Sequence, residues 1–158
     1  MTVVERPSDG LIAAQKGETC IAIWRHKPQQ MTFGIQRSML DRTVAAHPGK
    51  AKFLCVVEPD APAPDDDVRE ASADMVNEHG DKLIKVACVI EGDGLRATAN
   101  RAVLAAMSLF VRSPVATKFF GSVGSAARWL MESEGSAAAI NLELEVRDLR
   151  KRLDVMSA

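Results

Sequence analysis

An acidic segment contains the first group of side chains that could bind a ligand. Residues 58–67 (EPDAPAPDDD) contain three consecutive aspartates, Asp65, Asp66 and Asp67, and hard cations prefer such oxygen ligands. These aspartates lack the alternating spacing and the distal Glu of a calcium-binding loop. They more simply suit the start of a helix, where negative charge is favoured. The pattern therefore predicts a helix start, with a ligand-binding loop as the alternative.

A second candidate ligand loop spans residues 90–96 (IEGDGLR) and joins an apolar run to a helical segment through Gly92 and Gly94. Backbone amides in such a connection can hold a phosphate at a helix N-terminus. The segment has neither a Gly-Lys-Ser/Thr ending nor the third glycine of a dinucleotide-binding loop. Asp93 stands where a helix cap would be and would repel an anion. We expect a structural turn, and the alternative is a ligand cradle that includes Arg96.

The cysteines and serines give no pattern of nucleophilic or metal chemistry. Cys20, Cys55 and Cys88 each lie inside an apolar segment and more than 30 residues apart, which favours small buried side chains over a disulfide framework or a zinc site. The sequence Gly-Ser-Val-Gly-Ser around Ser122 is not a nucleophile motif. We therefore predict no catalytic residue, no metal and no cofactor.

Length and charge narrow the class of protein. The chain has 158 residues, and 20 Lys and Arg against 21 Asp and Glu leave no net field that would attract nucleic acid. No stretch approaches the ~18 apolar residues of a membrane span, and the first nine residues do not resemble a signal peptide. These features predict a cytoplasmic protein that binds no nucleic acid.

Hydrophobic periodicity predicts the helices and strands on which these residues lie. Lys16-Gly17 separates two β-prone runs and predicts a hairpin. Further strands are expected at 53–57, 83–90 and 115–120, and helices at 29–46, 68–79, 95–111 and 123–132. Helices that alternate with strands after a hairpin predict an α/β fold with one mixed sheet and helices packed on it.

A last helix, residues 137–156, follows a Gly-Ser pair, so we divide the chain into a domain at 1–134 and a helix at 135–158. Apolar residues at spacings of four and three form a short heptad seam on it: Leu142, Val146, Leu149 and Leu153. Because such a helix is marginal alone, the seam needs a cover. Pairing between two copies and packing on its own domain are both compatible with the pattern.

The helix at 29–46 has two apolar stripes. Phe33, Leu40 and Val44 form one, and Met31, Ile35 and Met39 lie about 140° away. A sheet needs only one stripe. The second is covered either by a neighbouring helix or by a partner protein, to whose shape Met side chains adapt readily.

Element order, together with the FLCVV and LIKVACVI strands and the closing stretch KFFGSVGSAARWL at 118–130, resembles STAS-type proteins, the fold of the anti-sigma-factor antagonists, and in particular their STAS-like branch. The resemblance covers residues 10–133. It implies regulation by protein–protein contact and, in many members, a phosphorylated Ser or Thr in an Asp-Ser-Ser/Thr-x-Gly loop. The segment after FLCVV lacks that loop, and Ser72 is the only hydroxyl there.

We therefore expect a non-enzymatic regulatory or scaffolding module that acts through protein–protein contacts as a homodimer or larger oligomer. The expected interface residues are those of the methionine stripe and of the seam on the last helix: Met31, Ile35, Met39, Leu142, Val146, Leu149 and Leu153. The alternatives are a domain that binds a small ligand or nucleotide at the carboxyl ends of the central strands, and a switch phosphorylated at Ser72.

Overall fold

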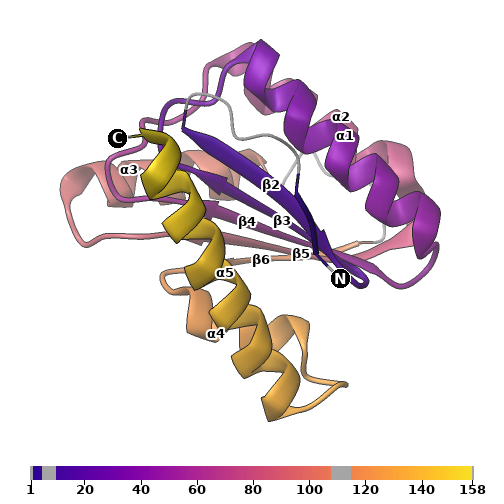
Figure 1. Cartoon of the computed structure of the whole chain (residues 1–158). Helices are drawn as coiled ribbons and strands as arrows, with labels where there is room; N and C mark the ends of the chain where they lie inside the picture. The colour runs from indigo at the N-terminus through magenta and orange to yellow at the C-terminus, as the bar shows by residue number, and fades with distance from the viewer. Residues whose placement is uncertain (1, 5–9, 108–114, 158) are drawn as a thin grey trace.

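A six-stranded mixed sheet, with its strands in chain order, forms the centre of the protein (Figure 1). The computed structural model describes residues 2–4, 10–107 and 115–157. The strands are β1 (Thr2–Val4), β2 (Leu11–Lys16), β3 (Thr19–Trp24), β4 (Ala51–Val57), β5 (Leu83–Ile90) and β6 (Ala116–Phe120). β1 pairs with β2, and β2 with β3, in the antiparallel sense, whereas β3 to β6 are parallel. The predicted fold class is confirmed; β1 is a strand that the sequence analysis does not predict.

The hairpin between β2 and β3 has the turn that the sequence predicts. Gly17 adopts a φ of 56°, a value that is unstrained for glycine but not for other residues. Lys16 and Thr19 pair across the turn. Successive side chains of a strand point to opposite faces of the sheet. β3 therefore contributes side chains to both faces, and all six of its residues are buried.

Helices cover both faces of the sheet. They are α1 (Gln30–Ala46), α2 (Asp66–His79), α3 (Leu95–Met107), α4 (Val123–Leu130) and α5 (Ser136–Ser157), with a short 3₁₀ turn, η1 (Gly80–Lys82). α1 and α2 pack on one face, and α4 and α5 on the other (Figure 1). Within the part of the chain that the structure describes, no helix is long and apolar enough to cross a membrane.

The seam of the last helix is buried within the protomer. Leu142, Val146, Leu149 and Leu153 are each at most 3% exposed and pack against strand residues such as Leu54 and Val56. Each such side chain contributes roughly 1.5–3 kcal/mol of transfer free energy. The seam therefore packs on the domain itself, and the expectation that it pairs two copies is wrong because the second face of the sheet needs this cover.

The predicted methionine stripe of α1 does not form one surface. Met31 is 89% exposed, Ile35 is half-buried, and Met39 is completely buried in the core between the helix and the sheet. α1 lies close to β2 and also contacts α2, so its buried sector is wider than one stripe. Met39 therefore cannot belong to a docking surface on the folded protomer, and the three residues do not act together.

Candidate functional site

Two four-residue segments of almost the same sequence end the two central strands. Cys55 to Glu58 reads Cys-Val-Val-Glu at the end of β4, and Cys88 to Glu91 reads Cys-Val-Ile-Glu at the end of β5. The two strands are parallel and pair in register, with Cys55 beside Cys88. Because successive side chains point to opposite faces, the segments place two thiols on the α1–α2 side and direct two carboxylates toward α5.

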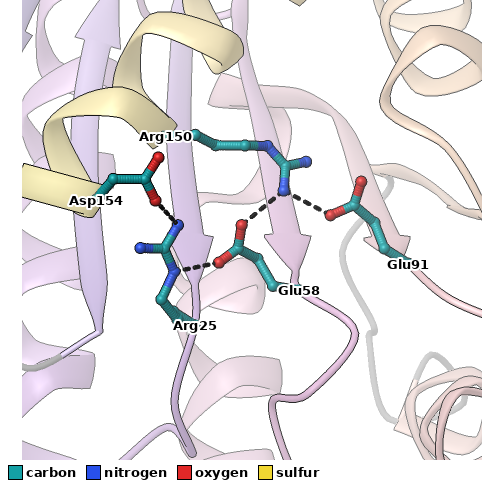
Figure 2. A network of polar contacts seen from close by, with 5 residues as sticks. All are labelled: Arg25, Glu58, Glu91, Arg150 and Asp154. Atoms are coloured by element: carbon teal, nitrogen blue, oxygen red, sulfur yellow. Dashed lines mark hydrogen bonds and ion pairs between the residues drawn. The ribbon is translucent and has the colours of Figure 1, made fainter. Parts of the chain in front are cut away.

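The two carboxylates share one arginine (Figure 2). Arg150 of α5 donates through Nη1 to Glu58 Oε2 and to Glu91 Oε1, each at 2.7 Å. Arg25, which follows β3, donates to Glu58 Oε1 at 2.6 Å and pairs with Asp154 of α5 at 2.8 Å. One residue directly after each of three parallel strands thus joins two residues of the last helix.

This ion-pair network occupies the carboxyl edge of the sheet. Open α/β sheets usually bind their ligands just outside the carboxyl ends of parallel strands. Here the Glu58 side chain is only 12% exposed, and Arg25 and Arg150 compensate its charge. Hydrogen bonds between ionised groups are the stronger kind. The network therefore anchors α5 to the sheet, and its two arginines are already engaged by the three carboxylates of Glu58, Glu91 and Asp154.

A cavity of about 100 Å³ lies on the opposite face, between the sheet and α2. Its lining is mostly apolar and includes Phe33, Phe53, Met75, Val86 and Phe119. None of the described residues that line it is charged. A single buried water needs only about 10–15 Å³, so the cavity is large enough for a small organic molecule.

The thiols of Cys55 and Cys88 lie in the wall of this cavity. Both residues keep part of their surface accessible although they lie in the middle of the sheet, which indicates that solvent reaches them through the cavity. The Cys55 thiol donates to Gln36 Oε1 at 4.0 Å. The neighbouring Cys88 thiol, followed by burial, raises the pKa of Cys55, and the neighbouring Cys55 thiol lowers the pKa of Cys88 against the opposing effect of burial. Of the two, Cys88 is therefore the better candidate for a thiolate.

The third cysteine differs from this pair. Cys20 is completely buried in the core and does not line the cavity. Burial raises the pKa of its thiol far above the ordinary value. Since the thiolate is the reactive form, Cys20 is the inert small side chain that the sequence predicts.

The polar groups of the cavity wall are mostly engaged with the protein. Gln36 accepts a hydrogen bond from Trp24 Nε1 at 2.7 Å, and Asn100 Nδ2 donates to the Ala61 carbonyl at 3.0 Å. Thr117 is the exception, because its buried hydroxyl has no hydrogen-bond partner among the described residues. A buried hydroxyl without a partner is unfavourable, and a ligand in the cavity could satisfy it.

The acidic ligand loop that the sequence leaves as an alternative does not converge on a site. Asp65 pairs with Lys27 at 2.7 Å, and Asp66 pairs with Arg69. Asp67 accepts from Gln30 at 3.0 Å, and this hydrogen bond lowers its pKa. All three aspartates are exposed. They begin α2 and contact its neighbours, so they act as helix-start residues and do not form a cation site.

The glycine loop at 92–94 is closed by the protein itself. Arg101 donates to the carbonyls of Ile90 and Gly92 at 3.0 and 2.6 Å. Gly92 has a φ of 100°, and a Cβ there would lie 3.2 Å from Pro59. Asp93 and Gly94 are exposed, and the Arg96 side chain lies outside the described part of the structure. The loop is a structural turn, as the sequence favours.

Ser72, the predicted phosphorylation site, lies in α2 and lines the cavity. It is half-buried, and its hydroxyl donates to the Val68 carbonyl at 2.8 Å. A phosphate there would bring about −1.5 to −2 charges toward an apolar wall. The position therefore does not favour phosphorylation, and the switch stays a prediction.

The paired thiols and the paired carboxylates are not predicted above, because the pattern within a single strand does not show which residue lies beside it on the next strand. The signal was the repetition of Cys-Val-Val-Glu as Cys-Val-Ile-Glu in consecutive strands. In neighbouring parallel strands such a repeat predicts like residues side by side. Arg25 has a related signal, since it is the first residue after a buried strand.

The described residues contain no group of three or more His, Cys, Asp or Glu that could hold a metal ion. Comparisons of the chain with protein-family models, with curated proteins and with solved structures found no match. The resemblance to STAS-like proteins accordingly stays a prediction.

Proposed function

We propose that this protein is a non-enzymatic binding module that holds a small, uncharged, mainly apolar molecule between α2 and the sheet. The observation that carries the proposal is the cavity of about 100 Å³, which has no charged residue in its described wall. An apolar cavity with a few polar groups is the usual form of a small-molecule site. The proposal keeps the small-ligand alternative of the sequence analysis but moves it from the strand ends to the face of the sheet.

The chemistry of the wall defines the class of ligand. An ion would lose its hydration without gaining a counter-charge, which is strongly unfavourable in apolar surroundings. A ring or a short aliphatic chain would instead contact Phe53, Met75 and Phe119. One carbonyl or hydroxyl on the ligand could bond to the buried hydroxyl of Thr117, for which the described residues supply no partner. We therefore expect a neutral molecule with one hydrogen-bonding group.

Self-association has less support than ligand binding. The seam of α5 is covered by the sheet, and Met39 lies in the core. The large apolar side chains that remain exposed among the described residues are distributed over four elements: Met31 lies on α1, Ile84 on β5 and Leu95 on α3, whereas Ile140, Leu144 and Val155 lie on α5. A regulatory role remains compatible with the proposal, since a module of this kind can report the presence of its ligand to a partner protein.

Tryptophan fluorescence tests the proposal. The chain has two tryptophans, and Trp24 lines the cavity whereas Trp129 packs on Phe120 against the other face. A Trp129→Phe protein therefore reports Trp24 alone. Titration with octanol, a neutral aliphatic probe, should change the Trp24 emission and reach saturation. The same probe should raise the melting temperature, since a ligand that binds the native state stabilises it.

A filled cavity supplies the control. Ala73 of α2 is buried and lines the cavity, so Ala73→Phe should abolish the saturable signal. Ala45→Phe adds the same ring at an exposed position of α1 and should leave the signal unchanged. Emission changes that rise linearly with octanol, or that persist in Ala73→Phe, would overturn the proposal.

A further inference from the structure

The cavity contains two groups that simple accommodation of an apolar molecule does not need, the paired thiols and the hydroxyl of Thr117. We propose that Cys88 captures an uncharged α,β-unsaturated carbonyl compound in this cavity as a covalent thioether. The inference rests on the proposed function, because the cavity must first admit the apolar part of the molecule.

The strand register gives Cys88 its neighbours. Cys55 pairs with it on β4, and Phe119 pairs with it on β6. Thr117 pairs with Val86, two residues before Cys88 and on the same face of the sheet. An enone bound with its alkene at Cys88 could therefore reach the Thr117 hydroxyl with its carbonyl oxygen.

The reaction is an addition in which every atom and electron is retained. The sulfur of Cys88 forms a bond to the β-carbon of the enone, and the carbon–carbon π bond breaks. The electron pair moves onto the carbonyl oxygen to give an enolate, and the thiol proton ends on the α-carbon. Neither partner is oxidised or reduced, so no further reactant is required.

Each polar group has a defined part in this addition. Cys55 lies beside Cys88 on the neighbouring strand and lowers the pKa of the Cys88 thiol, which favours the thiolate, the nucleophilic form. The Thr117 hydroxyl has no hydrogen-bond partner in the described ranges of the chain and can donate to the carbonyl oxygen as negative charge develops there. Cys55 and Thr117 are thus positioning residues, and Cys88 is the residue that forms the bond.

The uncharged wall of the cavity favours thioether formation over a permanent thiolate, and the lack of a required oxidant favours it over a disulfide. The described wall has no cation to compensate a permanent thiolate, so a neutral product is preferred. A thioether is neutral and forms without an oxidant, whereas a disulfide between the two cysteines would need one. The apolar wall then selects among electrophiles by retaining those with an apolar body.

The test compares cyclohexenone, a neutral cyclic enone, with acrylamide, a polar acceptor of the same reaction. Mass spectrometry of the intact full-length chain should show the mass of one cyclohexenone added, and peptide mapping should place it on Cys88. The ratio of the two labelling rates at Cys88 should exceed the ratio for glutathione by about tenfold, because the cavity orients the enone.

Variants separate the roles. Cys88→Ser and Cys88→Ala should both lose the adduct, and Cys20→Ser should keep it, since Cys20 lies outside the cavity wall. Cys55→Ser should slow the addition and shift its pH profile upward, and Thr117→Val should slow it for cyclohexenone at every pH. Circular dichroism melts establish that each variant is folded. Peptide mapping of the adduct on the chain without substitutions tests the proposal even if a variant fails to fold.

Saturated cyclohexanone distinguishes the two proposals. If cyclohexanone competes with octanol in the Trp24 titration but cyclohexenone adds no faster at Cys88 than at Cys20, the covalent inference fails and the proposed function stands. The covalent inference also fails if the labelling ratio equals that of glutathione. If neither octanol nor cyclohexanone gives a saturable signal, the proposed function fails first.

Discussion

The two faces of the sheet receive their side chains from the same repeated segment but differ in packing. On the α4–α5 side, Glu58 and Glu91 bind Arg150 and the apolar seam of α5 is buried. On the α1–α2 side, Cys55 and Cys88 line a cavity. Because successive side chains of a strand point to opposite faces, the same four-residue segment contributes to a closely packed face and to a face with a cavity.

The covering helices explain the difference. α4 and α5 together close the second face, and α5 supplies large aliphatic side chains to it at regular spacing. α1 and α2 place Gln36, Ser72 and Ala73 above the middle of the first face, and these side chains are polar or small. Protein interiors are otherwise closely packed. The cavity therefore results from the small and polar side chains that α1 and α2 place at this position.

The largest expected effect is that of opening the closed face. Leu149→Ala removes a side chain that is 1% exposed in the seam of α5, and we expect a loss of about 2–5 kcal/mol of unfolding free energy, the range for buried leucines that leave a cavity. Urea denaturation measures it as a fall in midpoint at constant slope.

Leu144 provides the matched control for this substitution. It lies on the same helix and is 44% exposed, so Leu144→Ala should change the free energy of unfolding by no more than about 0.5 kcal/mol. Equal effects of the two substitutions would mean that α5 does not close the face.

A second prediction compares the space on the two faces directly. Ala127 of α4 is completely buried against the α5 side, and Ala73 of α2 borders the cavity. Ala127→Leu should cost about 1–3 kcal/mol, because added atoms force a packed region apart. Ala73→Leu adds the same atoms beside empty space and should change the unfolding free energy by less than about 1 kcal/mol.

Denaturant melts of both variants measure this difference. Leucine is a good helix former, so intrinsic helix propensity affects the two sites alike. The comparison is broken if Ala73→Leu proves as costly as Ala127→Leu, since the cavity would then have no room for three further carbon atoms.

Local pattern was sufficient to predict most of the fold. The hairpin at Gly17 and the strand Leu83–Ile90 were predicted because turn chemistry and apolar runs are local properties. The segment that packs against the apolar face of a helix depends on tertiary contacts with distant parts of the chain. The seam of α5 fits a partner copy and the protein's own sheet equally well as a pattern, and Met39 is buried by contacts with distant segments.

The candidate site was harder to predict than the fold because it depends on strand register. Cys55 and Cys88 are 33 positions apart, and only the pairing of β4 with β5 brings them together. The predicted site residues Asp65 to Asp67 were chosen for their chemistry alone, and local ion pairs engage them. A repeat between consecutive parallel strands was the informative signal.

The smallest expected effect concerns a charged pair at the end of the closed face. Lys52 is 3% exposed and pairs with Glu134, which lies just before α5. The hydrogen bond from Lys52 lowers the pKa of Glu134 below its ordinary value of 4.5. A carboxyl group whose pKa is lowered by folding adds stability above its unfolded pKa, and this stability is lost as the pH falls through the folded pKa.

Glu134→Gln should therefore lower the unfolding free energy at neutral pH by about 1 kcal/mol or less, because the carboxylate is partly exposed to solvent. The difference from the unmodified protein should shrink as the pH falls below about 4.5, where the carboxyl of the unfolded chain protonates, and should vanish below the lowered pKa of Glu134 in the folded protein. Thermal melts at a series of pH values measure it, and Glu70→Gln, which alters an exposed carboxylate of α2, is the control. A difference that stays constant down to acid pH would show that the charge of Glu134 does not help to hold the closed face together.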